Sequence, residues 1–143
     1  MKRKILCLCS LVLPFAILVG NCLGQSNPLV GTWELVSAKR TFRDGSSDEW
    51  VPTTNGGRAI KIYNETHYSL IGREIDGSFM ATMAGSYVVN GNTSTEQIEF
   101  SLRPSWRDKE FVKTFSIEGD TCKFSYVSPF DKAKVEDVFR RVK

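Results

Sequence analysis

The fold is decided by the stretch Leu29-Val30-Gly31-Thr32-Trp33-Glu34-Leu35-Val36-Ser37, which follows an apolar leader. From Pro28 onward, short runs rich in Val, Ile, Thr, Tyr and Phe are separated by clusters of Gly, Asn, Asp and Ser. Runs of this kind, bounded by turn residues, are typical of β-strands. The quoted stretch is therefore predicted to begin an all-β domain.

The spacing of these runs predicts an antiparallel barrel. Strands are expected at residues 31–40, 58–63, 67–73, 78–83, 86–90, 96–103, 111–118, 121–128 and 135–142. Gly77, Gly91 and Gly119 supply the positive φ that tight hairpins require. About eight to nine such strands in chain order close a single up-and-down barrel with room for side chains or one small ligand. Residues 42–57 and 104–110 are expected to be loops.

Residues 1–24 are predicted to be a cleaved signal peptide. Basic residues 2–4 precede an apolar run at residues 5–19, and small residues follow. The run is short for a spanning helix of roughly 20 residues. A cut after Gly24 leaves the domain 25–143 soluble, whereas a cut before Cys22 at a lipobox-like site tethers it to a membrane. Either cut places the protein outside the cytoplasm, as a secreted, periplasmic or cell-envelope protein.

Charge and cysteine content exclude several classes of function. The leader carries three of the 19 Lys and Arg and none of the 16 Asp and Glu, so the mature domain has 16 of each and is formally neutral. A basic footprint for nucleic acid is therefore absent. Only Cys122, and Cys22 if it is retained, remain after cleavage, so no disulfide framework is available. His67 is the single histidine, and we expect neither a metal site nor a cofactor.

Two segments carry a resemblance to a known family. Gly31-Thr32-Trp33 matches the Gly-x-Trp signature of the first lipocalin strand, and residues 139–143 resemble the last strand of that calycin-type barrel. The resemblance implies that Arg141, or alternatively Arg140, lies across Trp33 and plugs one end of the barrel. A guanidinium on an indole ring gains a cation–π attraction. The pair would be structural.

The chain is more closely similar to small secreted lipocalin-like proteins of bacteria whose function is uncharacterised. The segments that carry this similarity are 31–37, 66–68, 84–87, 95–96, 117–120 and 136–143. The chain departs from classical lipocalins by lacking their C-terminal helix. The resemblance thus implies a barrel with a cavity and leaves the ligand unnamed.

Polar residues that could contact a ligand are few. His67 is either an acid or base that titrates near neutrality, or a histidine hydrogen-bonded at a strand edge. Glu96 shares strand parity with Ile98, which predicts a buried carboxylate that pairs with His67, Arg73 or Arg103, unless it lies in water at the strand end.

The leading hypothesis is a non-enzymatic, exported barrel that binds a small hydrophobic or amphipathic molecule. His67, Tyr87 and Glu96 would supply polar contacts, with Trp50 and Trp106 at the mouth. The enzyme alternative is isomerase, lyase or hydrolase chemistry with His67 as base and Glu96 orienting it, which requires both side chains inside within hydrogen-bond reach. The third alternative is a filled barrel that serves as an interaction module of the envelope and exposes an apolar patch.

Overall fold

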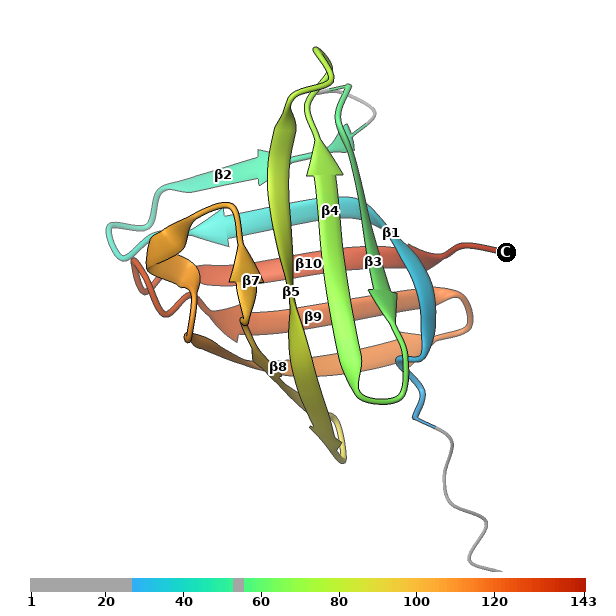
Figure 1. Ribbon diagram of the computed structural model, residues 1–143. Coiled ribbons are helices and arrows are strands. Elements are labelled where there is room, and N and C mark those ends of the chain that lie inside the picture. Colours follow the sequence, from blue (N-terminus) through green and yellow to red (C-terminus); the bar gives the residue numbers. More distant parts are fainter. Residues whose placement is uncertain (1–26, 53–55) are drawn as a thin grey trace, which may run out of the picture.

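The protein is described here by a computed structural model that covers residues 27–52 and 56–143. The leader and both expected cut positions lie outside these residues. Within them the chain forms antiparallel strands and one 3-10 turn (Figure 1). In chain order the elements are β1 (Gly31–Thr41), β2 (Ser47–Trp50), β3 (Arg58–Tyr63), β4 (His67–Arg73), β5 (Phe79–Asn90), β6 (Thr93–Gln97), β7 (Phe100–Ser101), η1 (Pro104–Trp106), β8 (Glu110–Glu118), β9 (Thr121–Val127) and β10 (Lys134–Arg141).

Pairing between the first and last strands closes the sheet into a barrel. The hydrogen-bonded order is β10-β9-β8-β6-β5-β4-β3-β1, and β1 returns to β10 with Trp33 opposite Arg141. β2 is added beside β1, and β7 is added beside β5. The expected all-β, up-and-down antiparallel barrel is confirmed, with eight strands in the closed circuit and two outside it.

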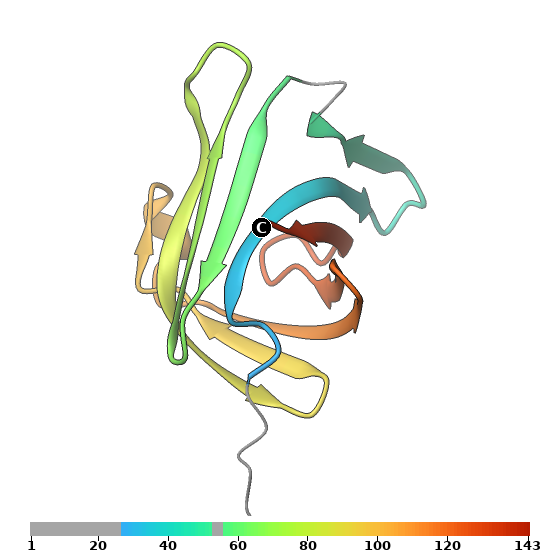
Figure 2. The same cartoon turned by 90° about the vertical axis from the view of Figure 1, so that its right-hand side faces the viewer.

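The end of the barrel where β1 begins, which we call the closed end, lies beside the C-terminus of the chain (Figure 2). Side chains plug this end. The Arg141 guanidinium lies 4.1 Å from the centroid of Trp33 and donates hydrogen bonds to the carbonyls of Val30 and Pro28. A Cβ on Gly31 would stand 2.5 Å from the Arg141 guanidinium, and the φ of Gly31 is +135°. Glycine is therefore required beside the arginine for both space and backbone conformation.

The opposite end, called the rim, includes β2 and the loops at residues 42–46, 74–78, 102–109 and 128–133. Arg40 forms an ion pair with Asp131, which ties the end of β1 to the β9–β10 loop. Trp106 of η1 stacks on Phe130 of the same loop, with ring centroids 4.6 Å apart. Aromatic side chains from separate loops thus pack together over this end of the barrel.

Three expectations about the strands are wrong: two predicted strands are merged, one strand was expected to be loop, and one predicted strand is divided. The predicted strands 78–83 and 86–90 are one strand, β5, which continues through Gly85. Glycine is needed at this position because a Cβ would stand 1.9 Å from the Gln97 carbonyl oxygen. This glycine marks a close approach of two backbones, where the sequence suggested a break. The predicted loop 42–57 contains β2, whose polar residues pair with the end of β1. The predicted strand 96–103 is divided between β6 and β7.

Candidate functional site

Three charged side chains meet inside the barrel and are almost completely buried. They are Lys61 of β3, Glu96 of β6 and Lys113 of β8, which we call the lysine–glutamate cluster. Lys61 Nζ lies 2.6 Å from Glu96 Oε1, and Lys113 Nζ lies 2.8 Å from Glu96 Oε2. The Tyr63 hydroxyl also donates to Glu96 Oε1, at 2.5 Å. One carboxylate therefore serves two ammonium groups and a phenol.

Strand alternation explains why these charges point inward. Successive side chains of a strand lie on opposite faces, so residues two apart share a face. Lys61 lies between the buried residues Ala59 and Tyr63, and Lys113 lies between the buried residues Phe111 and Phe115. Both lysines thus occupy positions where the barrel otherwise places apolar side chains. Barrel closure then brings β3 across the interior from β6 and β8.

Aromatic rings surround both ammonium groups. Lys61 Nζ lies 5.0 Å from the ring centroids of Tyr63 and Tyr68 and 5.2 Å from that of Phe124. Lys113 Nζ lies 4.9 Å from the centroid of the Phe111 ring. Cation–π attraction of this kind compensates part of the lost hydration. The cluster is therefore polar in its centre and aromatic at its boundary.

The two lysines differ in their protonation. Burial lowers the pKa of Lys61 to about 7, although attraction to Glu96 acts in the opposite direction. Burial also acts to lower the pKa of Lys113, but the charges of Glu96 and Asp137 raise it overall. Burial would raise the pKa of Glu96, but Lys113 and Lys61 lower it to about 2. Lys113 and Glu96 thus stay charged at neutral pH, while Lys61 exchanges its proton there.

Two buried hydroxyls on the barrel interior lack a hydrogen-bond partner among the described residues. They belong to Tyr68 of β4 and Ser94 of β6. Ser94 pairs with Lys113 in the β6–β8 register, and the Tyr68 ring faces Lys61. Buried hydroxyls are normally hydrogen-bonded, since leaving one unpaired costs about 1–3 kcal/mol. Both hydroxyls are therefore available to a polar occupant beside the cluster.

Glu96 is buried as its strand parity predicted, but its partners are not the expected His67, Arg73 or Arg103. They are Lys61 and Lys113, whereas Arg73 and Arg103 are exposed. The inward parity of the two lysines was a readable signal: RAIKIY and FVKTF both place Lys among core-facing residues. Which strands face each other across the interior was not readable, because that depends on closure and register.

His67 and Tyr87 do not join the cluster. His67 is exposed, and its Nδ1 lies 2.8 Å from the hydroxyl of Thr66. The enzyme alternative requires His67 and Glu96 to lie within hydrogen-bond reach of each other, and the structure does not bring them together. Tyr87 lies at the closed end, where its hydroxyl accepts a hydrogen bond from Asn27 and donates to the Asn64 carbonyl.

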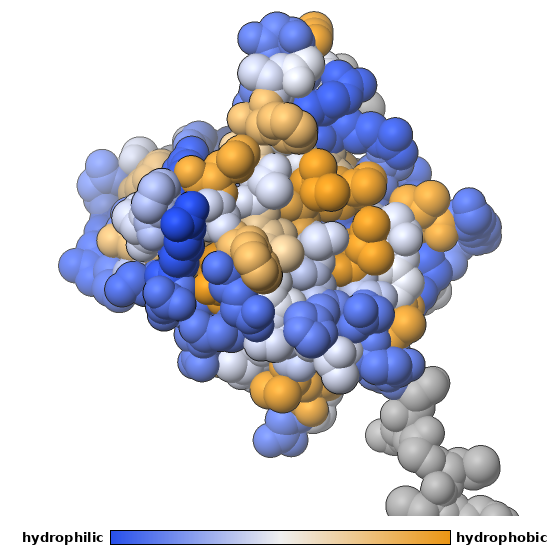
Figure 3. Space-filling model, viewed as in Figure 1, coloured by the Kyte–Doolittle hydropathy of each residue, from blue (hydrophilic) through white to orange (hydrophobic). Residues whose placement is uncertain are grey.

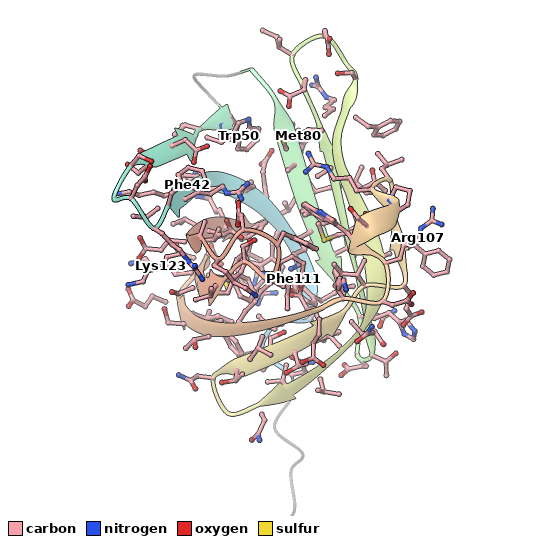
Figure 4. The ribbon with its side chains drawn as sticks, turned by 90° about the vertical axis from the view of Figure 1, so that its left-hand side faces the viewer. Phe42, Trp50, Met80, Arg107, Phe111 and Lys123 are labelled. Carbon is pink, nitrogen blue, oxygen red and sulfur yellow. The ribbon has the colours of Figure 1, made fainter. Side chains whose placement is uncertain are left out.

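The remaining predicted ligand contacts lie at the rim. Trp50 and Trp106 are half-buried and pack against the core, and Figure 4 labels Trp50 at this end. Arg103 is exposed, with its guanidinium 4.8 Å from the Trp106 ring centroid. The two tryptophans are thus placed at the end of the barrel expected for its mouth, whereas Arg103 covers Trp106 from outside.

A hollow of about 410 Å³ lies over the outer face of β8, β9, β10 and β1. The outward residues Thr114, Ser125, Glu136 and Lys39 follow one another across these strands, and Glu49 of β2 continues the row. This hollow is separated from the lysine–glutamate cluster by the sheet itself.

Of the parts of the chain described, none holds three or more His, Cys, Asp or Glu side chains placed for a metal ion. No helix among the described residues has the length and apolar character needed to cross a membrane.

Comparison with known proteins identifies the family. The family model of a domain of unknown function, DUF4488, matches residues 28–143. The chain belongs to the DUF4488 family. Its fold is similar to that of a lipocalin-like protein from Bacteroides uniformis, at 15% identity and a TM-score of 0.54 over 80% of this chain and 98% of that one. It is also similar to an uncharacterized protein from Bacteroides eggerthii, at 12% identity and a TM-score of 0.53 over 80% of this chain and 99% of that one. No curated protein matches.

These comparisons establish the fold of this DUF4488 domain and its resemblance to lipocalin-like bacterial proteins. Likeness at such low identity carries no site residues from one chain to the other. The chemistry of this member must therefore be argued from its own barrel interior.

Proposed function

We propose that this DUF4488 protein is an exported barrel that binds a small amphipathic molecule. The ligand enters at the rim, places its polar group at the lysine–glutamate cluster and packs its apolar part against the rim aromatics. The observation that carries the proposal is the buried cluster beside the unpartnered hydroxyls of Tyr68 and Ser94.

Energetics favour a binding role for these charges. Taking charged groups out of water costs several kcal/mol each, and replacing a buried ion pair by apolar residues is often neutral or stabilising. An aromatic barrel with apolar residues at positions 61, 96 and 113 would therefore fold without the cluster. Polar groups that converge in an apolar, concave interior are typical of small-molecule sites.

The rim supplies the apolar part of the site. Trp106, Phe130 and Phe111 contact one another there, and Trp50 of β2 packs against the core at the same end. These rings belong to loops or to the ends of strands, which move more readily than the centre of the sheet. Their displacement would admit a ligand to the interior while the closed end stays plugged.

Decanoate and decanol are suitable probes, because they share an apolar chain and differ in the polar group. Binding is measured by tryptophan fluorescence and by native mass spectrometry of the full chain after export. The test variant is K61M/E96L/K113M, which removes the cluster while keeping volume, and the control is K123M on the outer face of β9. We expect the wild type and K123M to bind a probe and the triple variant to bind it at least tenfold more weakly, or about 1.4 kcal/mol.

Two results would overturn the proposal. One is a wild-type protein that binds neither probe, and the other is a triple variant that binds as tightly as the wild type. Loss of binding in K123M alone would instead place the ligand in the outer hollow, because Lys123 lines it.

A second candidate function, an interaction module of the cell envelope, is favoured by the outer surface. The outer faces of β3, β4 and β5, together with residues 100–102, expose apolar side chains, and Figure 3 shows several apolar patches on this face with polar residues between them. They include Ile62, Ile71, Phe79, Val88, Phe100 and Leu102. Absence of probe binding together with a native mass equal to the bare polypeptide would favour this candidate.

A further inference from the structure

We infer that Lys61 is a nucleophilic amine and that the polar group of the ligand is an aldehyde, with which Lys61 forms an imine. The inference rests on the proposed function, since the ligand must reach the interior of the barrel. It goes further by naming the class of ligand and the atom that binds it.

The contacts of the cluster single out Lys61 from Lys113. Both ammonium groups share Glu96 and both experience the negative charge of Asp137 on β10, but the attraction between Asp137 and Lys113 is the stronger of the two. The oxygen that faces Lys61, Glu96 Oε1, already accepts a hydrogen bond from Tyr63. Lys61 therefore receives less compensation for its charge in a site that excludes water. A buried lysine with incomplete compensation releases its proton readily and becomes a nucleophile.

The surroundings of Lys61 suit each step of imine formation. The amine nitrogen attacks the carbonyl carbon, a C–N bond forms, and the carbonyl oxygen takes up a proton to give a carbinolamine. That oxygen then leaves with both amine hydrogens as water, so one aldehyde and one amine yield one imine and one water. Glu96 Oε1, 2.6 Å from Lys61 Nζ, relays the protons. The unpartnered Tyr68 hydroxyl is a donor for the carbonyl oxygen.

The aromatic boundary would stabilise the product. An imine is neutral and less strongly hydrated than an ammonium ion, so it suits the space between Tyr63, Tyr68 and Phe124 better than a charge does. Exclusion of water also slows the reverse reaction, which is hydrolysis. An exposed lysine such as Lys123 has neither advantage.

Decanal is the probe, with sodium cyanoborohydride present to reduce any imine to a stable secondary amine. The full chain after export is labelled, digested, and the modified lysines are located by tandem mass spectrometry. We expect Lys61 to be modified at least tenfold faster than Lys113 or Lys123. The rate should rise as the pH increases through 7, and K61M should lose the fast phase.

K113M provides a matched control within the cluster. Without Lys113, Glu96 compensates Lys61 alone, so the Lys61 ammonium is retained and its labelling at neutral pH should slow severalfold. Slower labelling of Lys61 in K113M is not expected if Lys113 only supports the fold. If K61M fails to fold, comparison of the Lys61 and Lys123 peptides in the wild type gives the same information.

The outcomes separate this inference from the proposed function. Uniform labelling of surface lysines with Lys61 unmodified, in a protein that binds decanoate or decanol, overturns the imine and leaves the binding function standing. If decanal, decanoate and decanol all fail to bind, both are overturned. Fast labelling of Lys61 that excess decanoate suppresses supports both.

Discussion

The closed end and the centre of this barrel both bury polar groups, but they satisfy them differently. At the closed end, Trp33 Nε1 donates to the Leu29 carbonyl, Arg141 donates to two carbonyls, and Tyr87 has two partners. In the centre, Tyr68 and Ser94 have unpartnered hydroxyls beside one carboxylate that serves two lysines. Fully partnered groups fix a structure, whereas unpartnered groups can bind a further molecule.

The largest effect should come from the closed end. Trp33 is buried to 99%, and Trp33→Ala should lower the free energy of unfolding by about 3–5 kcal/mol through loss of packing and the cavity left behind. Urea denaturation monitored by circular dichroism measures the change. A variant that retains full stability would contradict the assignment of the closed end as the structural part of the barrel.

Removal of the shared carboxylate should have the next largest effect. Glu96→Leu removes the counter-ion that the two buried lysines share and should cost about 3 kcal/mol, whereas K61M/E96L/K113M should be as stable as the wild type or more stable. The same denaturation experiment compares them. If the triple variant is as unstable as Glu96→Leu, the cluster is a structural element like the closed end.

The pH dependence of stability should distinguish Lys61 from the closed-end arginine. The pKa of Lys61 is lowered to about 7 in the folded state, so between pH 7 and about 10 the unfolded chain binds the additional proton. Stability therefore rises with pH in this window, by up to about 1.4 kcal/mol per unit. Urea denaturation at pH 7, 8 and 9 measures the slope. An equal slope in Lys61→Met would show that another group is responsible.

The smallest effect should come from the Tyr87 hydroxyl. Tyr87→Phe removes one donor and one acceptor at the closed end and should cost about 1 kcal/mol. Decanoate binding should be unchanged, because the hydroxyl bonds only closed-end residues and Tyr87→Phe keeps the ring that packs on Tyr63. Weaker binding in this variant would extend the site to the closed end and erase the distinction between the two regions.

Local pattern accounts for what could be predicted, and Trp33 and Glu96 illustrate it. The inward position of each follows from strand alternation, and the strands follow from short runs of β-forming residues between turn residues. Gly85 was misread because a glycine needed for close backbone approach has the same sequence signal as one in a turn. β2 was missed because residues 47–49 are polar and the strand pairs only with the extended end of β1.

The sequence by itself determined most of the strands, the face each side chain takes and the formal neutrality of residues 25–143, since these depend on neighbouring residues and on composition. Only the tertiary structure decided that Lys61 and Lys113 share Glu96, and that His67 lies outside. These contacts join strands far apart in the chain, and their distances depend on closure of the sheet and on register. Burial within the closed barrel then sets the pKa of Lys61, which no local pattern specifies.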